Sequence, residues 1–402
     1  SSSLAHARSM ALYDGSRVVH LSVFQKGFRF EVNDDGSKIV SEKWLSPLLS
    51  TVDVTETDKT HNNVFIEKLH NKIVFALINR KMQWLPRFNY DHVVKILETV
   101  KELFMAESPL VECGPDIQIV GDLHGSIYDA RRIYNNFREG LSDRSYIPSH
   151  LAYSFCFLGN YVDRGDNSLE LLMLLFSMKI SAQLANTKVI MLRGNHETRE
   201  MNYAKGFRAE LHSKFEKEKA DDLFEKFNEV FDHMPLACLI ANRHLCVHGG
   251  ISPKLASLDA IRQIPKPLKR VDKHKLACDL LWADFKEGLK GFEPNTDRDI
   301  SVRFGRDVLE DTLDRLRLEF LIRSHQKVKF GVECNGLMMT ITSFSGKNKK
   351  NNVGIGKIHR DGQAELGTCG PMDGLHAFEV MEENPAENQE ERGDFIIEMG
   401  DI

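Results

Sequence analysis

Five short apolar runs in this sequence are each followed at once by side chains that can bind metal ions. The runs are residues 117–120, 153–158, 188–192, 244–247 and 320–322. The side chains that follow them include carboxylates, amides and imidazoles: Asp122, His124, Asn160, Asp163, Asn195, His196, His248 and His325. Such groups suit divalent first-row ions such as Mn, Fe or Zn. Two such ions about 3.5–4 Å apart can clamp a phosphoryl group and generate hydroxide near neutral pH. The residue types therefore favour metal-assisted phosphate chemistry.

The same five runs have the character of short β-strands, and longer helical patterns lie between them. Apolar residues recur at helical spacing in 128–138, 169–179 and 215–231, and the same spacing predicts two helices upstream, at 63–80 and 90–105. Strands that alternate with helices indicate an α/β fold with βαβ crossovers. Because ligands bind such folds at the carboxyl ends of the strands, we expect the polar clusters to line one crevice.

Charge and composition argue against several classes of partner. The chain has 402 residues and a formal net charge of −5, and its residues 381–402 hold eight acidic side chains and one basic side chain. The remainder has no strong charge bias, so no nucleic-acid partner is expected. No apolar run is long enough to span a bilayer, so no membrane is expected either. The seven cysteines form no C-x-x-C pair, which favours buried thiols in a reducing compartment, cytoplasmic and/or nuclear.

Three segments can be separated along the chain. Residues 1–62 read as an extension, in which β-forming residues around Asn33-Asp34-Asp35-Gly36 predict a small hairpin and the polar stretch 52–62 predicts a linker. Residues 63–373 contain all the polar clusters and are predicted to form one catalytic domain. Residues 374–402 are predicted to form an acidic C-terminal tail.

The motifs and their order resemble those of the phosphoprotein phosphatase family of protein serine/threonine phosphatases, and they are most similar to the type 1 enzymes. The family has G-D-x-H-G, G-D-x-V-D-R-G, R-G-N-H-E and H-G-G in this order. This chain has G-D-L-H-G, G-N-Y-V-D-R-G, R-G-N-H-E and H-G-G, starting at residues 121, 159, 193 and 248. The resemblance implies an α/β fold of the metallophosphoesterase type, with four layers: a central β-sandwich flanked by helices.

The resemblance also implies a role for each site residue. Two divalent metal ions of the Mn, Fe or Zn class would be held, the first by Asp122 and His124. The second would be held by Asn195, His248 and His325, with position 160 bridging both. His196 would be the general acid, oriented by Asp163, and a metal-bound hydroxide would be the nucleophile. Arg164, Asn195 and Arg298 would bind the phosphate.

The chain departs from the family pattern at the bridging position, where Asn160 replaces aspartate. An amide has one neutral oxygen and an NH₂ group that cations repel, so weaker metal occupancy and a large loss of turnover are expected. A second departure is the loop 342–352, which lacks the tyrosine that overhangs the active site of type 1 enzymes. In addition, Asp299 stands where the family has glycine. An engineered change and a natural inactive relative both fit Asn160.

Three functions therefore stay open from the sequence. The first is a metal-dependent protein serine/threonine phosphatase whose activity is impaired by Asn160. The second is a catalytically inactive pseudophosphatase that binds phosphoproteins or serves as a scaffold. The third, a metallophosphoesterase acting on nucleotides or nucleic acid, is disfavoured by the V-D-R-G and R-G-N-H-E motifs. A phosphoprotein substrate or ligand and a regulatory protein partner are expected. His244 matches no motif and is predicted to be a core residue.

Overall fold

The computed structural model describes residues 87–136, 153–183, 187–328, 332–346 and 352–369, together with the backbone of 31–32 and 38–39. The helix predicted at 63–80, the linker 52–62 and the acidic tail 374–402 lie outside these residues. Near the N-terminus, β1 (Glu31–Val32) pairs antiparallel with β2 (Lys38–Ile39), on either side of the predicted hairpin turn.

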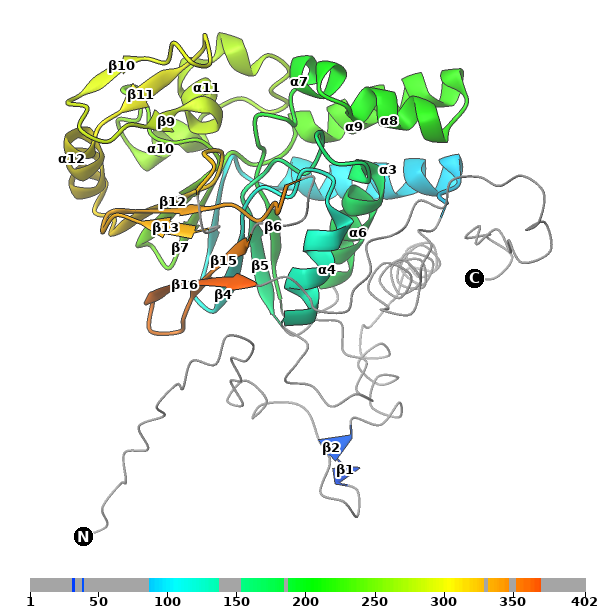
Figure 1. Cartoon of the computed structure of the whole chain (residues 1–402), viewed down its shortest axis with the longest axis horizontal. Helices are drawn as coiled ribbons and strands as arrows, with labels where there is room; N and C mark the ends of the chain where they lie inside the picture. Colours follow the sequence, from blue (N-terminus) through cyan, green and yellow to red (C-terminus); the bar gives the residue numbers. More distant parts are fainter. Residues whose placement is uncertain are drawn as a thin grey trace.

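Two β-sheets form the centre of the molecule (Figure 1). The five-stranded sheet has the order β16-β15-β4-β5-β6, and β4, β5 and β6 are parallel. The six-stranded sheet has the order β13-β14-β12-β8-β7-β3, and β12 is parallel to both β8 and β14. The strands of the first sheet are β4 (Ile117–Val120), β5 (Ser154–Phe157), β6 (Val189–Met191), β15 (Val353–Ile358) and β16 (Ala364–Cys369). Those of the second are β3 (Leu110–Cys113), β7 (Ala237–Ile240), β8 (His244–Val247), β12 (Phe320–Arg323), β13 (Val332–Cys334) and β14 (Met338–Ile341).

Helices cover the outer face of each sheet, so that the layers run helix, sheet, sheet, helix. In Figure 1, α4 and α6 lie beside β4–β6, and α10–α12 lie on the opposite side of the molecule. The first helical layer contains α3 (Tyr90–Ala106), α4 (Ile127–Asn136), α6 (Ser168–Ala182), α7 (Arg199–Ala204), α8 (Phe207–Lys214) and α9 (Lys217–Asp232). The second contains α10 (Leu258–Arg262), η2 (Val271–Lys273), α11 (Lys275–Trp282) and α12 (Arg306–Leu316), beside a small sheet of β9 (Asp284–Phe285), β10 (Phe292–Pro294) and β11 (Val302–Phe304).

A cluster of apolar side chains fills the space between the two sheets. Ile119 and Leu158 contribute from the five-stranded sheet, and Ile240 and Ile322 from the six-stranded sheet. All four side chains are at most 1% exposed. The predicted four-layer sandwich with flanking helices is therefore confirmed.

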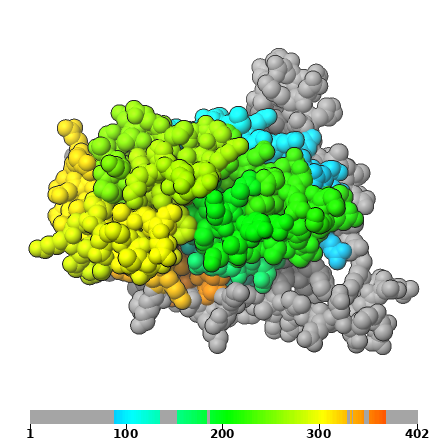
Figure 2. Space-filling view, turned by 90° about the horizontal axis from the view of Figure 1, so that it is seen from above, coloured from blue at the N-terminus to red at the C-terminus, as the bar shows by residue number. Residues whose placement is uncertain are grey.

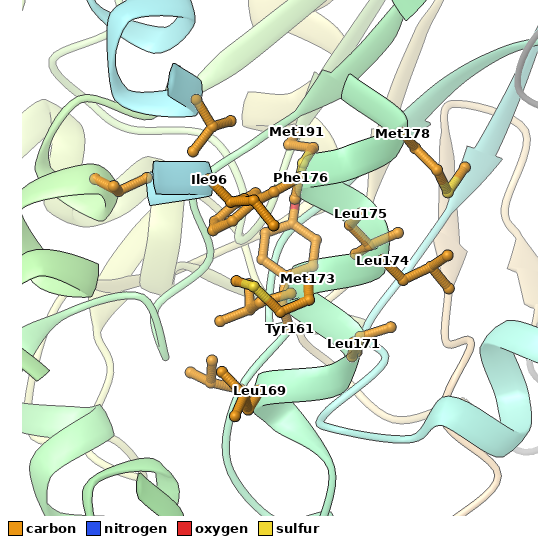
Figure 3. Close-up of a cluster of buried hydrophobic side chains, with 14 of the residues drawn as sticks. Ile96, Tyr161, Leu169, Leu171, Met173, Leu174, Leu175, Phe176, Met178 and Met191 are labelled. Carbon is orange, nitrogen blue, oxygen red and sulfur yellow. The ribbon is translucent and has the colours of Figure 1, made fainter. Parts of the chain in front are cut away.

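Helix α6 shows how the outer layer is held against the five-stranded sheet. All its residues are buried, including Leu171, Met173 and Phe176. Figure 3 shows its side chains pointing to several sides, toward Ile96 of α3, Met191 of β6 and Tyr161. A helix that is apolar all round must be enclosed by other elements. This burial fixes α6 and the loop that precedes it, which contains Asp163 and Arg164.

The predicted elements lie close to those observed. Strands β4 and β8 have the predicted bounds; β5 and β6 are one residue shorter than predicted at each end, and β12 is one residue longer at its C-terminal end. The predicted helices correspond to α3, α4, α6 and α9 with small shifts. No helix in the described part of the chain has the length and apolar character needed to cross a membrane.

Candidate metal centre

The predicted site residues lie in loops that follow the carboxyl ends of five strands, except Arg298, which lies between β10 and β11. The loops after β4, β5 and β6 come from one sheet, and the loops after β8 and β12 come from the other. Five of the site residues have a positive φ, between 44° and 69°: His124, Asn160, Asp163, Arg164 and His325. Non-glycine residues rarely adopt this left-handed conformation, which is strained and is concentrated at functional sites. The loops are thus bent to turn these side chains toward one another.

Asp122 and His124 form the first candidate ligand group. Nδ1 of His124 lies 2.9 Å from the carbonyl oxygen of Val162 and must donate to it. In the neutral ring, Nε2 then has the lone pair, and it lies 3.2 Å from Oδ2 of Asp122. Among the described residues, this buried Nε2 has no hydrogen-bond partner. A lone pair that faces a carboxylate oxygen in a buried site is suited to a cation.

The electrostatics of Asp122 agree with this arrangement. Its Oδ1 accepts a hydrogen bond of 2.6 Å from Oγ of Ser324. Burial opposes ionisation of Asp122, but the positive charge that His124 and His248 have when protonated, together with the hydrogen bond from the Ser324 hydroxyl, outweighs it. These interactions hold the pKa of Asp122 well below its ordinary value. Asp122 is therefore a buried anion that faces imidazole nitrogens.

Asn195 and His248 form the second candidate ligand group. Nδ1 of His248 donates to the carbonyl oxygen of Leu158 at 2.8 Å. Burial lowers the pKa of His248 to about 4, so its ring is neutral at physiological pH and Nε2 has a lone pair. This Nε2 lies 2.9 Å from Oδ1 of Asn195, another acceptor. Two acceptors at this distance repel each other unless a cation, or a flipped Asn195 amide, stands between them.

His325 lies beside this second group. Its ring centroid is 5.1 Å from that of His248, and its backbone N–H lies 3.3 Å from Oδ1 of Asp122. Its Nε2 is 3.5 Å from Oδ1 of Asp284, and in the described part of the chain neither atom has a hydrogen-bond partner. The ring is therefore placed between the ligand groups and a buried carboxylate.

Asn160 lies between the two groups, at the predicted bridging position. Its Nδ2 donates to Oδ2 of Asp122 at 3.1 Å, and its Oδ1 accepts from the backbone N–H of His196 at 3.0 Å. The side chain is 1% exposed. The NH₂ group of the amide thus points to the carboxylate that would bind the first ion, and both ends of the amide have partners within the protein.

The atoms available as metal ligands can be compared with the needs of the metal ions that the resemblance implies. The lone pairs of His124 and His248 point to oxygen atoms, so each group offers one imidazole and one oxygen to an ion. Within the described residues, however, no three carboxylate, imidazole or thiol side chains converge as a metal site. The two groups consequently fit divalent ions only if amide oxygens complete the ligand sets. The position that lacks a carboxylate is that of Asn160.

His196 and Asp163 form a buried pair next to these groups. Nδ1 of His196 lies 2.7 Å from Oδ2 of Asp163, and the His196 ring centroid lies 4.7 Å from that of His124. Burial raises the pKa of Asp163 to about 7. Burial, followed by the nearby His124 and Arg164, holds the pKa of His196 well below its ordinary value. Nδ1 of His196 is thus in hydrogen-bond contact with Asp163, and its Nε2 faces Nη2 of Arg164 at 3.4 Å.

The two predicted phosphate-binding arginines differ in how they are held. Arg164 is exposed, and its only hydrogen-bond contact among the described residues is with His196. Arg298 is anchored, because its Nε donates to Oδ2 of Asp284 at 3.0 Å. Asn295 also donates to this oxygen, at 2.8 Å. Asp284 thus links Arg298 to the neighbourhood of His325, a role that was not predicted from the sequence.

Glu197 is a second residue whose role was not predicted. Its buried carboxylate accepts hydrogen bonds of 2.8–3.3 Å from the backbone N–H groups of Asn160, Tyr161, Val162 and Gly194. It thereby ties the loop after β5 to the loop after β6. Gly194 is required there, because a Cβ would collide with the backbone and the side-chain oxygen of Asn160. The R-G-N-H-E motif contains both residues, which is the signal that could have found Glu197.

The loop that lacks the family tyrosine has a phenylalanine at the site instead. The ring of Phe344 packs edge-on against His124, with centroids 5.4 Å apart. Ser343 holds the loop by accepting from Gly121 N at 2.8 Å and donating to Gly354 O at 2.6 Å. His244 lies elsewhere, buried, with its Nε2 2.9 Å from Gly362 O, which confirms its prediction as a core residue.

Comparison with known proteins gives matches to phosphatases, including the following three. The model of the calcineurin-like phosphoesterase family matches residues 116–329. The serine/threonine-protein phosphatase PP1-delta of Caenorhabditis elegans is 38% identical over 245 residues, which are 61% of this chain and 74% of that protein. A solved protein serine/threonine phosphatase from Saccharomyces cerevisiae, with similarity to human phosphatase PP5, has a TM-score of 0.61 and 28% identity. It covers 76% of this chain and 97% of its own.

The fold is thus a metallophosphoesterase α/β fold, with mixed sheets flanked by helices. The chain belongs to the calcineurin-like phosphoesterase family and, within it, to the serine/threonine protein phosphatases.

Proposed function

We propose that this chain is a type 1-like protein serine/threonine phosphatase in which Asn160 lowers the activity. The observation that carries this proposal is the presence of two imidazole–oxygen pairs, His124 with Asp122 and His248 with Asn195, at the ends of strands, with Asn160 bonded to Asp122. Divalent ions held by these residues would supply an activated water and positive charge for the phosphate. The substrate class is a phosphoserine or phosphothreonine side chain of a protein.

The protein residues have separate tasks in this proposal. Arg298, held by Asp284, and the exposed Arg164 bind phosphate oxygens, for which a guanidinium is well suited. Asn195 binds the phosphate and is also a ligand of the second metal ion. His196 protonates the leaving serine or threonine oxygen from Nε2, and Asp163 fixes the opposite ring nitrogen.

Asn160 affects metal binding more than phosphate binding. Two dications held close together repel each other, and a bridging carboxylate offsets part of that repulsion, which an amide cannot do. The Nδ2 group of Asn160 is directed at Asp122, which further weakens the binding of the first ion. Arg164 and Arg298 do not touch Asn160 in any contact of the described residues. Phosphoprotein binding can therefore persist when turnover is low.

The alternative is a pseudophosphatase that binds phosphoproteins without hydrolysing them. It is favoured by one observation, that both ends of the Asn160 amide are already bonded to Asp122 and His196. A bridging position whose amide is satisfied by hydrogen bonds without an ion is what a binding protein would need. In both cases a phosphoprotein is the expected ligand, and a regulatory protein is an expected partner.

Substitution of the bridging residue tests the proposal. We expect Asn160→Asp to raise phosphopeptide hydrolysis by more than about tenfold, equivalent to about 1.4 kcal/mol in barrier height. Bound metal should rise in parallel, measured by elemental analysis on both proteins prepared identically. His196→Ala in the Asn160→Asp background is the matched control, because it should abolish the gain in turnover while metal content stays high. Metal uptake without turnover would instead favour the pseudophosphatase.

A further inference from the structure

A positively charged edge borders the candidate site where α7 meets α8. Lys205 and Gly206 connect the two helices, and the backbone N–H of Phe207 donates to Oδ1 of Asp163 at 2.8 Å. A Cβ built at Gly206 would lie 3.8 Å from the backbone nitrogen of Arg164. The connection is therefore packed directly against the residues that orient His196 and bind phosphate. We call Arg164, Tyr203, Lys205 and Arg208 the α7–α8 edge.

The side chains of this edge are unusually accessible. Tyr203 is 59% exposed and is one of two large hydrophobic side chains that are exposed in the described chain. The guanidinium of Arg208 lies 4.9 Å from the Tyr203 ring centroid, and Phe224 supports the ring from the other side. Arg164 and Lys205 are exposed as well. Figure 2 looks onto the surface of α7–α9, in green, next to the segment that contains β10 and β11, in yellow. An exposed aromatic ring held by a cation is typical of a binding surface.

The charges of the edge are only partly neutralised within the protein. Arg208 pairs with Asp221 at 2.9 Å, and Asp221 also contacts His212. By contrast, neither Arg164 nor Lys205 has an ion-pair partner anywhere in the described residues. The acids close to them in the sequence have other partners: Asp163 contacts His196 and the backbone N–H of Phe207, Glu200 lies 3.7 Å from Arg270, and Glu210 pairs with Lys214 at 2.7 Å. Arg164 and Lys205 therefore border the position proposed for the phosphate without an ion pair of their own among the described residues.

We propose that the α7–α8 edge selects phosphoprotein segments with acidic residues next to the phosphorylated serine or threonine. Lys205 is the principal residue that binds these acidic side chains. This inference rests on the proposed function, since it requires a phosphoprotein in the site. Arg164 binds the phosphate. Lys205, in the connection between α7 and α8, pairs with the carboxylates that precede or follow the phosphorylated residue. The ring of Tyr203 supports the peptide backbone between them.

The test uses three phosphopeptides that differ only in the residues flanking one phosphothreonine, which are acidic, alanine or lysine on both sides. Binding to the chain is measured by fluorescence anisotropy, and hydrolysis is measured in the Asn160→Asp background. An exposed charge pair changes affinity by about twofold to fivefold, so the chain should bind acidic peptides more tightly than alanine peptides by about that factor. The preference should fall with added salt, as the screening length decreases from roughly 10 Å at 0.1 M to roughly 3 Å at 1 M.

Charge reversal identifies the residue. Lys205→Glu should invert the preference, so that the variant binds the lysine peptides most tightly. The matched control is Lys226→Glu on α9, whose lysine pairs with Asp222 beside Tyr90, on the face toward α3. It should leave the preference for acidic peptides unchanged. The melting temperature of Lys205→Glu should equal that of the parent, because Lys205 is exposed and has no ion pair among the described residues. Lys226→Glu loses the pair with Asp222 and should melt slightly lower.

The outcomes separate the two proposals. Equal handling of all three peptides, unaffected by Lys205→Glu, would overturn the role of the α7–α8 edge and leave the phosphatase proposal standing. If neither the chain nor Asn160→Asp binds or hydrolyses any phosphopeptide, the proposed function fails, and this inference fails with it.

Discussion

Asn160 makes the contacts that a cation would otherwise make for its neighbours. Its amide bonds to the side chain of Asp122 and to the backbone of His196. The loops after β4, β5 and β6 are therefore connected here by hydrogen bonds. A carboxylate in the same place would put a second negative charge about one hydrogen-bond length from Oδ2 of Asp122. Two buried carboxylates in such proximity repel each other unless a cation lies between them. Asparagine therefore suits a metal-free site, and aspartate suits a metal-loaded one.

This reasoning predicts that Asn160→Asp makes the stability of the fold dependent on metal. In the presence of a chelator, the substitution should lower the free energy of unfolding by about 1–3 kcal/mol, within the usual range for a single change. Excess Mn²⁺ should restore it, because a ligand that binds only the folded state stabilises that state. Urea unfolding with and without metal measures both effects, and the parent chain should respond weakly.

Asn160→Ala is the control, since it removes the hydrogen bonds without adding charge. It should be destabilising in chelator, but Mn²⁺ should not rescue it as it rescues Asn160→Asp. An Asn160→Asp protein that is as stable as the parent in chelator would contradict the idea that the amide replaces a cation.

Residue types were the part of the site that the sequence could predict. Asp122, His124, Asn195, His196, His248 and His325 stand in short motifs directly after apolar runs. Supporting residues could not be found in this way when their partners are distant in the chain: Ser324 bonds to Asp122 across 202 positions. Asp284 acts through Arg298 and Asn295, and nothing in its local sequence indicates either contact.

At the scale of elements, buried Arg193 connects the loop after β6 to two other segments. Its Nε donates to Glu197 O at 2.8 Å, its Nη1 to Leu268 O at 2.7 Å and its Nη2 to Asp232 at 2.9 Å. Asp232 is the last residue of α9, and Leu268 precedes η2. One guanidinium therefore holds the loop with Asn195 and His196 against both helical layers.

Arg193→Ala is expected to destabilise the fold by about 3–5 kcal/mol, because it leaves Asp232 as a buried charge without its partner. The comparison is Arg199→Ala, which removes an ion pair with Glu225 whose side chains are 44% and 58% exposed. That change should cost at most about 1 kcal/mol. Urea unfolding of the two variants gives both values. A similar cost for both would show that the loop is held by other contacts.

The elements that the sequence predicted were those with long or strongly apolar patterns. Strand β4 has four buried residues and was found with its observed bounds, as was β8. Strand β7 is also fully buried but was not predicted, because a run of four apolar residues does not by itself distinguish a strand from a piece of helix, and no metal-binding motif follows it as one follows β4 and β8. Strands β9–β11 have two or three residues each, too few for a period to be visible.

At the scale of the whole molecule, the site depends on how the two sheets pack. Asp122, Asn160 and Asn195 follow strands of the five-stranded sheet, whereas His248 and His325 follow strands of the six-stranded sheet. No single sheet contains a complete set of ligands. The contact between Ser324 and Asp122 crosses from one sheet to the other, and the apolar cluster between the sheets holds that alignment.

Ile322→Ala should therefore disturb both sheets together. Ile322 is fully buried between them and lies one residue before Arg323, which begins the segment that leads to His325. Removing its side chain should lower the free energy of unfolding by about 2–5 kcal/mol. Hydrogen exchange measured by mass spectrometry should show loss of protection in β4 and β5 as well as in β8 and β12. Leu309→Ala on α12, a buried change in the outer layer, is the control and should expose mainly the six-stranded half. If Ile322→Ala leaves β4 and β5 protected, the two sheets are independent units, and the site cannot owe its geometry to their packing.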